Sequence, residues 1–404
     1  MFLLLPTLAL LVGVSFASAS QITLSHTDRS NPDSFHAERR SLLNKYAGFA
    51  KRHFNSTGQH LDIVDLHYAD KQKRASGKTS LRYDTYWTGS IHVGSPPQAV
   101  PVVFDTGSSD LILDKSFYNP KKSRSANNLD TPFDFSYINL HVYGDIYSDH
   151  VAIGDVKADN VPIGHGREDF DGDLAGGKFG LSFSTAENSG FDVKQDPFIW
   201  AAKKQNPIQS SSFQFTLRRS GKATLNVGDV DHSELAGPIS WADKNTDKSF
   251  WRTSVELNGN KIENAIIDSG TNVITGPNDQ VKAVLDQLDG VWVEQSPDGT
   301  YQGRYSCQNP PNLHFTVAGQ TFKLSSDAIN FGYAGDKCFL AMGGTLGLMT
   351  GSSALPSWSS APSSLTMTRA AWALLKHANL CYVCLSVSLP LFLGGYAASS
   401  DIPL

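Results

Sequence analysis

The chain has 404 residues, of which 40% are hydrophobic and 18% are charged, and its formal net charge is −5 at pH 7. This is the composition of a folded globular protein, and a net negative chain gives no electrostatic reason to expect a nucleic-acid partner. Four cysteines are too few for a disulfide-rich scaffold.

Residues 1–19 have the pattern of a cleavable signal peptide. An apolar core runs from Phe2 to Val14, and Ala17-Ser18-Ala19 fits the small-residue pattern at which signal peptides are cut. We therefore expect a secreted, extracellular protein without a membrane partner. A vacuolar destination is the alternative.

Residues 20–74 are expected to form a basic segment that is later removed. They contain nine Lys or Arg and six Asp or Glu, a net charge of +3, whereas residues 75–404 carry −8. They also contain five of the twelve histidines, so acidification would make the segment more positive. Lys73-Arg74 is the last of three dibasic pairs, and cutting there would leave 330 residues, enough for two lobes with a core each.

Two short segments that lie 163 residues apart share one pattern. Each is an apolar run followed by Asp, a small hydroxyl residue, Gly and a second hydroxyl residue. The repeat predicts that Asp105 and Asp268 lie on two related loops of one site. The residues expected to support these carboxylates are Thr106, Gly107, Ser108, Ser269, Gly270 and Thr271, because glycine permits close approach of the loops and hydroxyls can hold the carboxylates.

A pair of adjacent carboxylates has a defined chemistry. Two such groups cannot both ionise cheaply, so they share one proton and titrate at separate apparent pKa values. One carboxylate can then take a proton from water while the other donates a hydrogen bond to a substrate carbonyl. This chemistry needs no metal, cofactor or covalent intermediate. The alternative is that each motif is a strand ending in a surface Asp-Ser-Gly turn, which the second copy argues against.

With these motifs, the chain resembles the pepsin-like aspartic peptidases from about residue 83 to residue 343. Similar segments are Tyr86–Ile91, Gly94–Gln98 and the region from Phe213 to Trp251. The resemblance implies an all-β dominated, bilobal fold of double β-barrel or sheet architecture with a pseudo-two-fold axis. It implies a signal peptide at 1–19, a prosegment at 20–74, an N-terminal catalytic lobe at 75–238 and a C-terminal catalytic lobe at 239–345.

The same resemblance implies roles for further residues near the site. A hairpin of Tyr143, Gly144 and Asp145 would close over bound peptide, with the Tyr143 ring capping the site. Ile146 stands where a Gly is usual at the hairpin tip. A prosegment lysine often caps the two Asp residues in this family, and Lys45 or Lys51 is the candidate here.

Two structural features of the lobes are implied as well. Phe179-Gly180 matches the apolar-Gly pair that supports the first Asp loop, and Lys178 is an unusual charge in that segment. Cys307 and Cys338 match the disulfide of the second lobe. We expect a monomer whose partners are its own prosegment and a peptide or protein substrate.

Residues 346–404 depart from the resemblance. They are Ser-rich and then apolar, and they lack the apolar-Gly strand that supports the second Asp loop in this family. Two hypotheses follow. The chain is a secreted aspartic endopeptidase acting at acid pH, or it is a catalytically impaired or non-catalytic peptide-binding relative because its C-terminal lobe is truncated or frameshifted.

Overall fold

The computed structural model describes the chain in parts. These are residues 20–24, Arg39, Leu42, Lys45, Tyr46, Phe49, residues 87–345 except 137–140, 169–175, 184–188, 206, 209–211, 217–222, 229, 232, 234–239, 244–249 and 272, and residues 369–373 and 384–387. The signal peptide, Lys51 and the dibasic pair at 73–74 lie outside the described residues.

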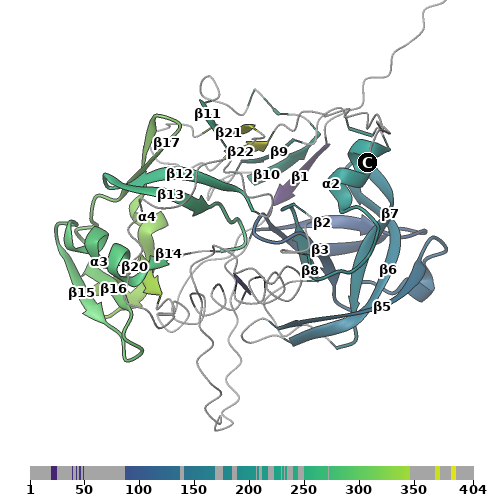
Figure 1. Ribbon diagram of the computed structural model, residues 1–404, viewed down its shortest axis with the longest axis horizontal. Coiled ribbons are helices and arrows are strands. Elements are labelled where there is room, and N and C mark those ends of the chain that lie inside the picture. Colours follow the sequence, from purple (N-terminus) through teal and green to yellow (C-terminus); the bar gives the residue numbers. More distant parts are fainter. Residues whose placement is uncertain are drawn as a thin grey trace, which may run out of the picture.

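The first lobe is built on one seven-stranded sheet (Figure 1). Its strands, in spatial order, are β2 (Thr88–Val93), β3 (Gln98–Asp105), β8 (Gly177–Gly180), β4 (Leu111–Leu113), β7 (Val156–Gly166), β6 (His141–Ile153) and β5 (Asn127–Ser136). A 3₁₀ turn, η1 (Pro120–Lys122), and helix α2 (Phe198–Lys204) complete it. The strand β8 lies between β3 and β4, parallel to the first and antiparallel to the second.

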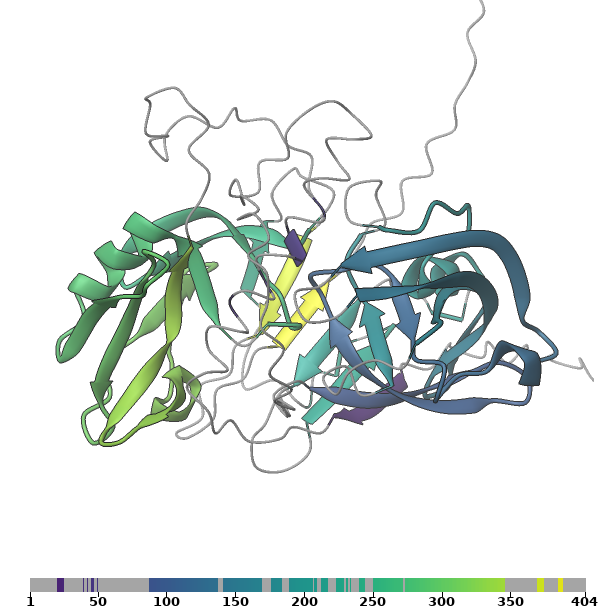
Figure 2. The ribbon, with the colours of Figure 1, turned by 90° about the horizontal axis from the view of Figure 1, so that it is seen from below.

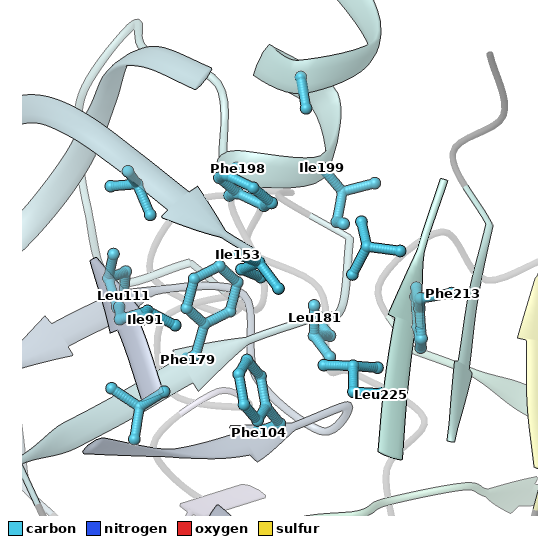
Figure 3. Packing of buried hydrophobic residues seen from close by; sticks show 14 of the residues in the cluster. Ile91, Phe104, Leu111, Ile153, Phe179, Leu181, Phe198, Ile199, Phe213 and Leu225 are labelled. Atoms are coloured by element: carbon cyan, nitrogen blue, oxygen red, sulfur yellow. The ribbon is translucent and has the colours of Figure 1, made fainter. Parts of the chain in front are cut away.

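The core of this lobe follows from the alternation of apolar side chains along the strands. Ile91 and Val93 are fully buried on β2, while Ser90 and His92 between them are exposed. Phe104 and Phe179 meet with ring centroids 5.4 Å apart, next to Leu181 and Phe198 (Figure 3). This packing fixes the strand that ends at Asp105.

The second lobe consists of two separate sheets (Figure 1). One contains β13 (Asn260–Ile266), β12 (Arg252–Leu257), β17 (His314–Val317) and β18 (Gln320–Lys323). The other contains β14 (Ile274–Pro277), β20 (Lys337–Thr345), β16 (Tyr301–Ser306), β15 (Val291–Gln295) and β19 (Asn330–Ala334). The helices are α3 (Asn278–Asp286), which packs on β20 and β16, and α4 (Ser326–Ile329).

Two small sheets lie between the lobes (Figures 1 and 2). One pairs β1 (Ser20–Leu24) with β10 (Ala223–Val227) and β9 (Phe213–Thr216), so the start of the N-terminal segment (residues 20–74) joins the body of the protein. The other pairs β11 (Ser240–Asp243) with β21 (Arg369–Ala373) and β22 (Cys384–Val387). The expected β-rich, bilobal fold is therefore confirmed.

The lobes correspond strand by strand around the two Asp motifs, with one exception. The strands β3 and β13 lead into the motifs, and the next strands, β4 and β14, run parallel to β7 and β20. In the first lobe β8 joins β3 to β4. In the described part of the second lobe, no strand joins β13 to β14. In the family that the sequence resembles, the corresponding strand is the apolar-Gly strand that the sequence of residues 346–404 lacks.

Candidate active site

The two Asp motifs meet at the junction of the lobes and are interlocked by reciprocal hydrogen bonds. The Thr106 backbone N–H donates to Ser269 Oγ (3.0 Å), and the Ser269 N–H donates to Thr106 Oγ1 (2.9 Å). Each hydroxyl also donates to a backbone carbonyl of the other lobe, Thr106 to Ile267 at 2.8 Å and Ser269 to Phe104 at 2.8 Å. The first hydroxyl residue of each motif thus ties one lobe to the other.

The glycines of the motifs allow the carboxylates to approach. The Gly107 N–H donates to Asp105 Oδ1 at 3.0 Å, and the Gly270 N–H donates to Asp268 Oδ1 at 2.8 Å. A Cβ on Gly107 would collide with the carboxyl group of Asp268, and one on Gly270 would collide with that of Asp105. Each Asp therefore packs against the glycine of the opposite motif, and a larger residue would force the loops apart.

A lysine of the N-terminal segment sits between the two carboxylates. Lys45 Nζ lies 2.8 Å from Asp105 Oδ1 and 2.8 Å from Asp268 Oδ2, and its side chain is buried. The next residue, Tyr46, donates its hydroxyl to Asp268 Oδ2 at 3.0 Å. Of the two lysines considered from the sequence, the structure places Lys45 at the site.

Aromatic and polar contacts hold this segment in place. The rings of Tyr46, Phe49 and Phe250 pack with centroids 5.4 to 5.9 Å apart. Closer to the N-terminus, the buried Arg39 forms an ion pair with Asp298, with 2.6 Å between Nη2 and Oδ2, and its guanidinium group also donates to the Thr300 hydroxyl. Residues upstream of the first lobe thus occupy the space above both carboxylates.

A second lysine reaches Asp105 from the lobe itself. Lys178, on β8, has a buried side chain, and its Nζ lies 3.1 Å from Asp105 Oδ2. Ser108 Oγ donates to the same oxygen. The sequence had marked Lys178 only as an unusual residue in a supporting segment.

The surroundings drive the pKa values of the two carboxyls in opposite directions. Burial alone would raise the pKa of Asp105, but the positive charges of Lys178 and Lys45 outweigh burial and hold this pKa well below its usual range. Burial raises the pKa of Asp268, and the negative charge of Asp105 adds to this against the opposing effect of Lys45. Burial beside these carboxylates raises the pKa of Tyr46 as well, so its hydroxyl stays a donor. In this arrangement Asp105 stays ionised to a lower pH than Asp268.

The two loops differ in how they are supported. Under the first loop, β8 and the residues after it bind the backbone: the Leu181 N–H donates to the Asp105 carbonyl (2.8 Å) and the Ser182 N–H to the Ser108 carbonyl (2.8 Å). Ser108 also reaches the Asp105 carboxylate. Thr271 occupies the corresponding position in the second motif, and its buried hydroxyl has no hydrogen-bond partner among the described residues. Among the residues that the structure describes, nothing gives the second loop the support that β8 gives to the first.

The expected position of the hairpin turn is wrong. Tyr143, Gly144 and Asp145 lie inside the continuous strand β6, where Gly144 pairs with Phe133 on one side and Gly166 on the other. The Tyr143 hydroxyl donates to Glu168 at 2.6 Å. The antiparallel strands β5 and β6 are separated in the sequence by residues 137–140, which lie outside the described residues. The burial of Val142, Gly144 and Ile146 in alternation is the period of an uninterrupted strand.

The second lobe carries the expected disulfide. Cys307 and Cys338 are bonded, and the bond links the end of β16 to β20. It lies in the sheet that contains β14, the strand that follows the Asp268 loop.

The fold and the interlocked Asp motifs define a two-lobed, pepsin-like β protein. Comparison with known proteins agrees: residues 86–355 match the model of the eukaryotic aspartyl protease family. The chain belongs to this family. Among the residues that the structure describes, none of the helices is both long and apolar enough to cross a membrane.

Its relatives include secreted fungal proteins. Secreted aspartyl protease 1 of Malassezia globosa is 32% identical over 311 residues, 75% of this chain and 77% of the relative. A probable inactive secreted aspartyl protease of the same fungus is 30% identical over 292 residues, 67% of this chain and 73% of the relative. Chymosin of Camelus dromedarius is 26% identical over 302 residues, 66% and 74% of the two chains.

Proposed function

We propose that this chain is the precursor of a secreted aspartic endopeptidase that hydrolyses peptide bonds at acid pH, with Asp105 and Asp268 as the catalytic pair. The observation that carries the proposal is the position of the two carboxylates, which are close enough to bind the same ammonium group at 2.8 Å each. Family membership supports the reaction class.

The pKa directions suggest a role for each residue. Ionised Asp105 accepts a proton from a water molecule, whose oxygen attacks the carbonyl carbon of the scissile peptide bond. Protonated Asp268 donates to the carbonyl oxygen. When the tetrahedral intermediate collapses, the C–N bond breaks, the leaving nitrogen takes the proton held by Asp105, and a hydroxyl of the intermediate returns a proton to Asp268. The products are a carboxylic acid and an amine. Thr106, Gly107, Ser108, Ser269 and Gly270 support this pair. Thr271 is expected from the sequence to do the same, but its hydroxyl has no hydrogen-bond partner among the described residues.

Lys45 supports the precursor hypothesis. Its ammonium group occupies the place between the carboxylates that the attacking water needs, so the described arrangement is closed to substrate. Activity therefore requires the N-terminal segment to leave, and cleavage after Lys73-Arg74 would separate it from residues 75–404. The relatives that are named as secreted, together with the signal-peptide pattern, support secretion, and a vacuolar destination is the alternative.

A non-catalytic peptide-binding protein is the second candidate. The described residues give the Asp268 loop no counterpart of β8, which favours this candidate because a catalytic group must be held rigidly. A similar protein of Malassezia globosa is named a probable inactive secreted aspartyl protease, which supports this candidate.

One experiment separates the two candidates. Secreted protein is acidified, and cleavage of denatured haemoglobin and binding of a peptide-like transition-state mimic are measured together. An active peptidase cleaves the substrate and binds the mimic far more tightly than a matched substrate peptide. A peptide-binding relative binds both peptides comparably and releases no fragments, which would overturn the proposal.

A further inference from the structure

We propose that Lys178 is a permanent cation of the site, a positioning residue that sets the acid range in which the Asp105–Asp268 pair carries its single proton. The catalytic consequence rests on the proposed function. The electrostatic claim concerns the pair alone and can be tested without activity.

The fold holds Lys178 in place through its backbone. The residue lies within β8, where it pairs with Val103 of β3 on one side and with Ile112 of β4 on the other. The next residue, Phe179, turns into the core against Phe104 (Figure 3), so the Lys178 side chain leaves the opposite face of the strand. Only 8% of this side chain is exposed. A buried ammonium group is costly unless an anion compensates it, and Asp105 provides that anion.

Lys178 and Lys45 do not compete for the same position. Lys45 and the Gly107 N–H bind Asp105 Oδ1, whereas Lys178 and the Ser108 hydroxyl meet Oδ2. Lys45 belongs to the N-terminal segment, and Lys178 belongs to the sheet of the first lobe. Removal of the segment therefore removes one cation from Asp105 and leaves the other.

Among the described residues, three charged or titratable side chains other than the two carboxylates contact the pair. Lys45 and Tyr46 come from the N-terminal segment, Lys178 comes from β8, and the carboxylates face each other. The charge of Arg252 acts on Tyr46, where it opposes the rise of the pKa of that hydroxyl. Once the segment has left, Lys178 is the cation of this set that remains. Among the charges that lower the pKa of Asp105, that of Lys178 has the largest effect.

A fixed cation changes the pair in a predictable direction. It favours the ionised form at both titration steps, so the range in which the pair holds one proton moves to lower pH. Replacing Lys178 with an uncharged residue should therefore move both limbs of the pH–activity profile to higher pH. A residue with a purely structural role would lower activity without moving the limbs.

The direct test is a titration of the carboxyl of Asp105 by ¹³C NMR in the full chain labelled at Asp Cγ. The parent is Lys45→Met, which removes the competing cation, and the resonance is assigned by its loss in Asp105→Asn. The test variants add Lys178→Met or Lys178→Gln, the second in case the first does not fold. The charge-retaining variant adds Lys178→Arg. The surface control adds Lys204→Met, which breaks the exposed pair with Asp196.

Loss of the cation should raise the titration midpoint at Asp105 by about 1 to 3 pH units, whereas the Arg variant and the surface control should stay within about 0.5 unit of the parent. A midpoint that moves by less than about 0.3 unit in the Met and Gln variants would overturn the proposal. If the midpoint moves but no variant cleaves peptides, the role of Lys178 stands and the proposed function fails. If peptides are cleaved and the midpoint does not move, the proposed function stands and the role of Lys178 fails.

Discussion

Lys45 is predicted to contribute most to holding the N-terminal segment over the two carboxylates. The substitution Lys45→Met should therefore shift the protein towards an arrangement in which the site is open to ligands. Loss of one partner from a buried ion pair usually costs about 3 to 5 kcal/mol. We place this variant at about 3 kcal/mol, because Asp105 keeps Lys178 and Asp268 can take up a proton. That free energy corresponds to a roughly 100-fold shift from the closed to the open arrangement.

The shift can be measured as apparent affinity for a peptide-like transition-state mimic, since binding to a fractionally open site is weakened by that fraction. At neutral pH the uncut Lys45→Met chain should bind the mimic roughly 100-fold more tightly than the uncut wild type. Lys282→Met, which breaks an exposed ion pair with Asp286, is the matched control and should leave affinity unchanged. Equal affinity of the Lys45→Met chain and the wild type for the mimic would refute the claim that Lys45 holds the N-terminal segment over the site.

Acidification should release the segment when Asp105 takes up a proton. Burial raises the pKa of Asp268, so protonation of this carboxyl favours the buried arrangement and does not by itself release the segment. The pKa of Asp105 is depressed, so its stabilising pair with Lys45 is fully present above the ordinary pKa of an aspartate and is lost only as the pH falls through the lower, folded-state value. Binding of the mimic to the uncut wild type should therefore rise only at a pH below the ordinary pKa of an aspartate, whereas a rise that is complete above that pKa would contradict the depressed pKa of Asp105.

Three further variants test other parts of the account. Thr106→Val removes the hydroxyl that links the lobes and should lower the free energy of unfolding by about 1 to 3 kcal/mol in urea titrations; no change would mean that the interlock does not stabilise the protein. The double variant Cys307→Ser/Cys338→Ser should lose about 2 to 4 kcal/mol, and thermal unfolding with and without a reductant checks this. Alanine at both Lys73 and Arg74 should abolish a secreted form that begins at Ala75, and a wild-type N-terminus far upstream, read by mass spectrometry, would refute this processing site.

The sequence was sufficient to predict the centre of the fold. The two motifs carry their own local signals, an apolar strand, an acid, a glycine and hydroxyls, and their repetition revealed that they belong together. The Cys307–Cys338 bond was implied by the resemblance. These features depend on residues that are close in the sequence or on a repeated pattern, and a single sequence contains both kinds of signal.

The missed features depend on contacts between distant segments. Ile146 is expected at the hairpin tip from the resemblance, yet it pairs on both sides within β6. Lys178 is only an unusual charge in the sequence, because its place beside Asp105 depends on the sheet order that sets β8 next to β3. The choice between Lys45 and Lys51 needed the packing of Tyr46 and Phe49 on the second lobe.

The most direct test of the central claim is acid-pH peptidase activity of three proteins that have lost the N-terminal segment: the wild type, Asp105→Asn and Asp268→Asn. Each variant replaces one carboxyl by an amide of similar shape. Asp105→Asn leaves the buried Lys178 ammonium group without its anion and should lower the free energy of unfolding, so urea unfolding gives the folded fraction and activity is compared per folded molecule. The account predicts that the wild type cleaves denatured haemoglobin and that either substitution removes all but a few per cent of this activity, because neither carboxyl can take over the protonation role of the other. Substantial activity in either variant, or a wild type that binds peptide without cleaving it, would contradict the proposal that Asp105 and Asp268 form a catalytic pair.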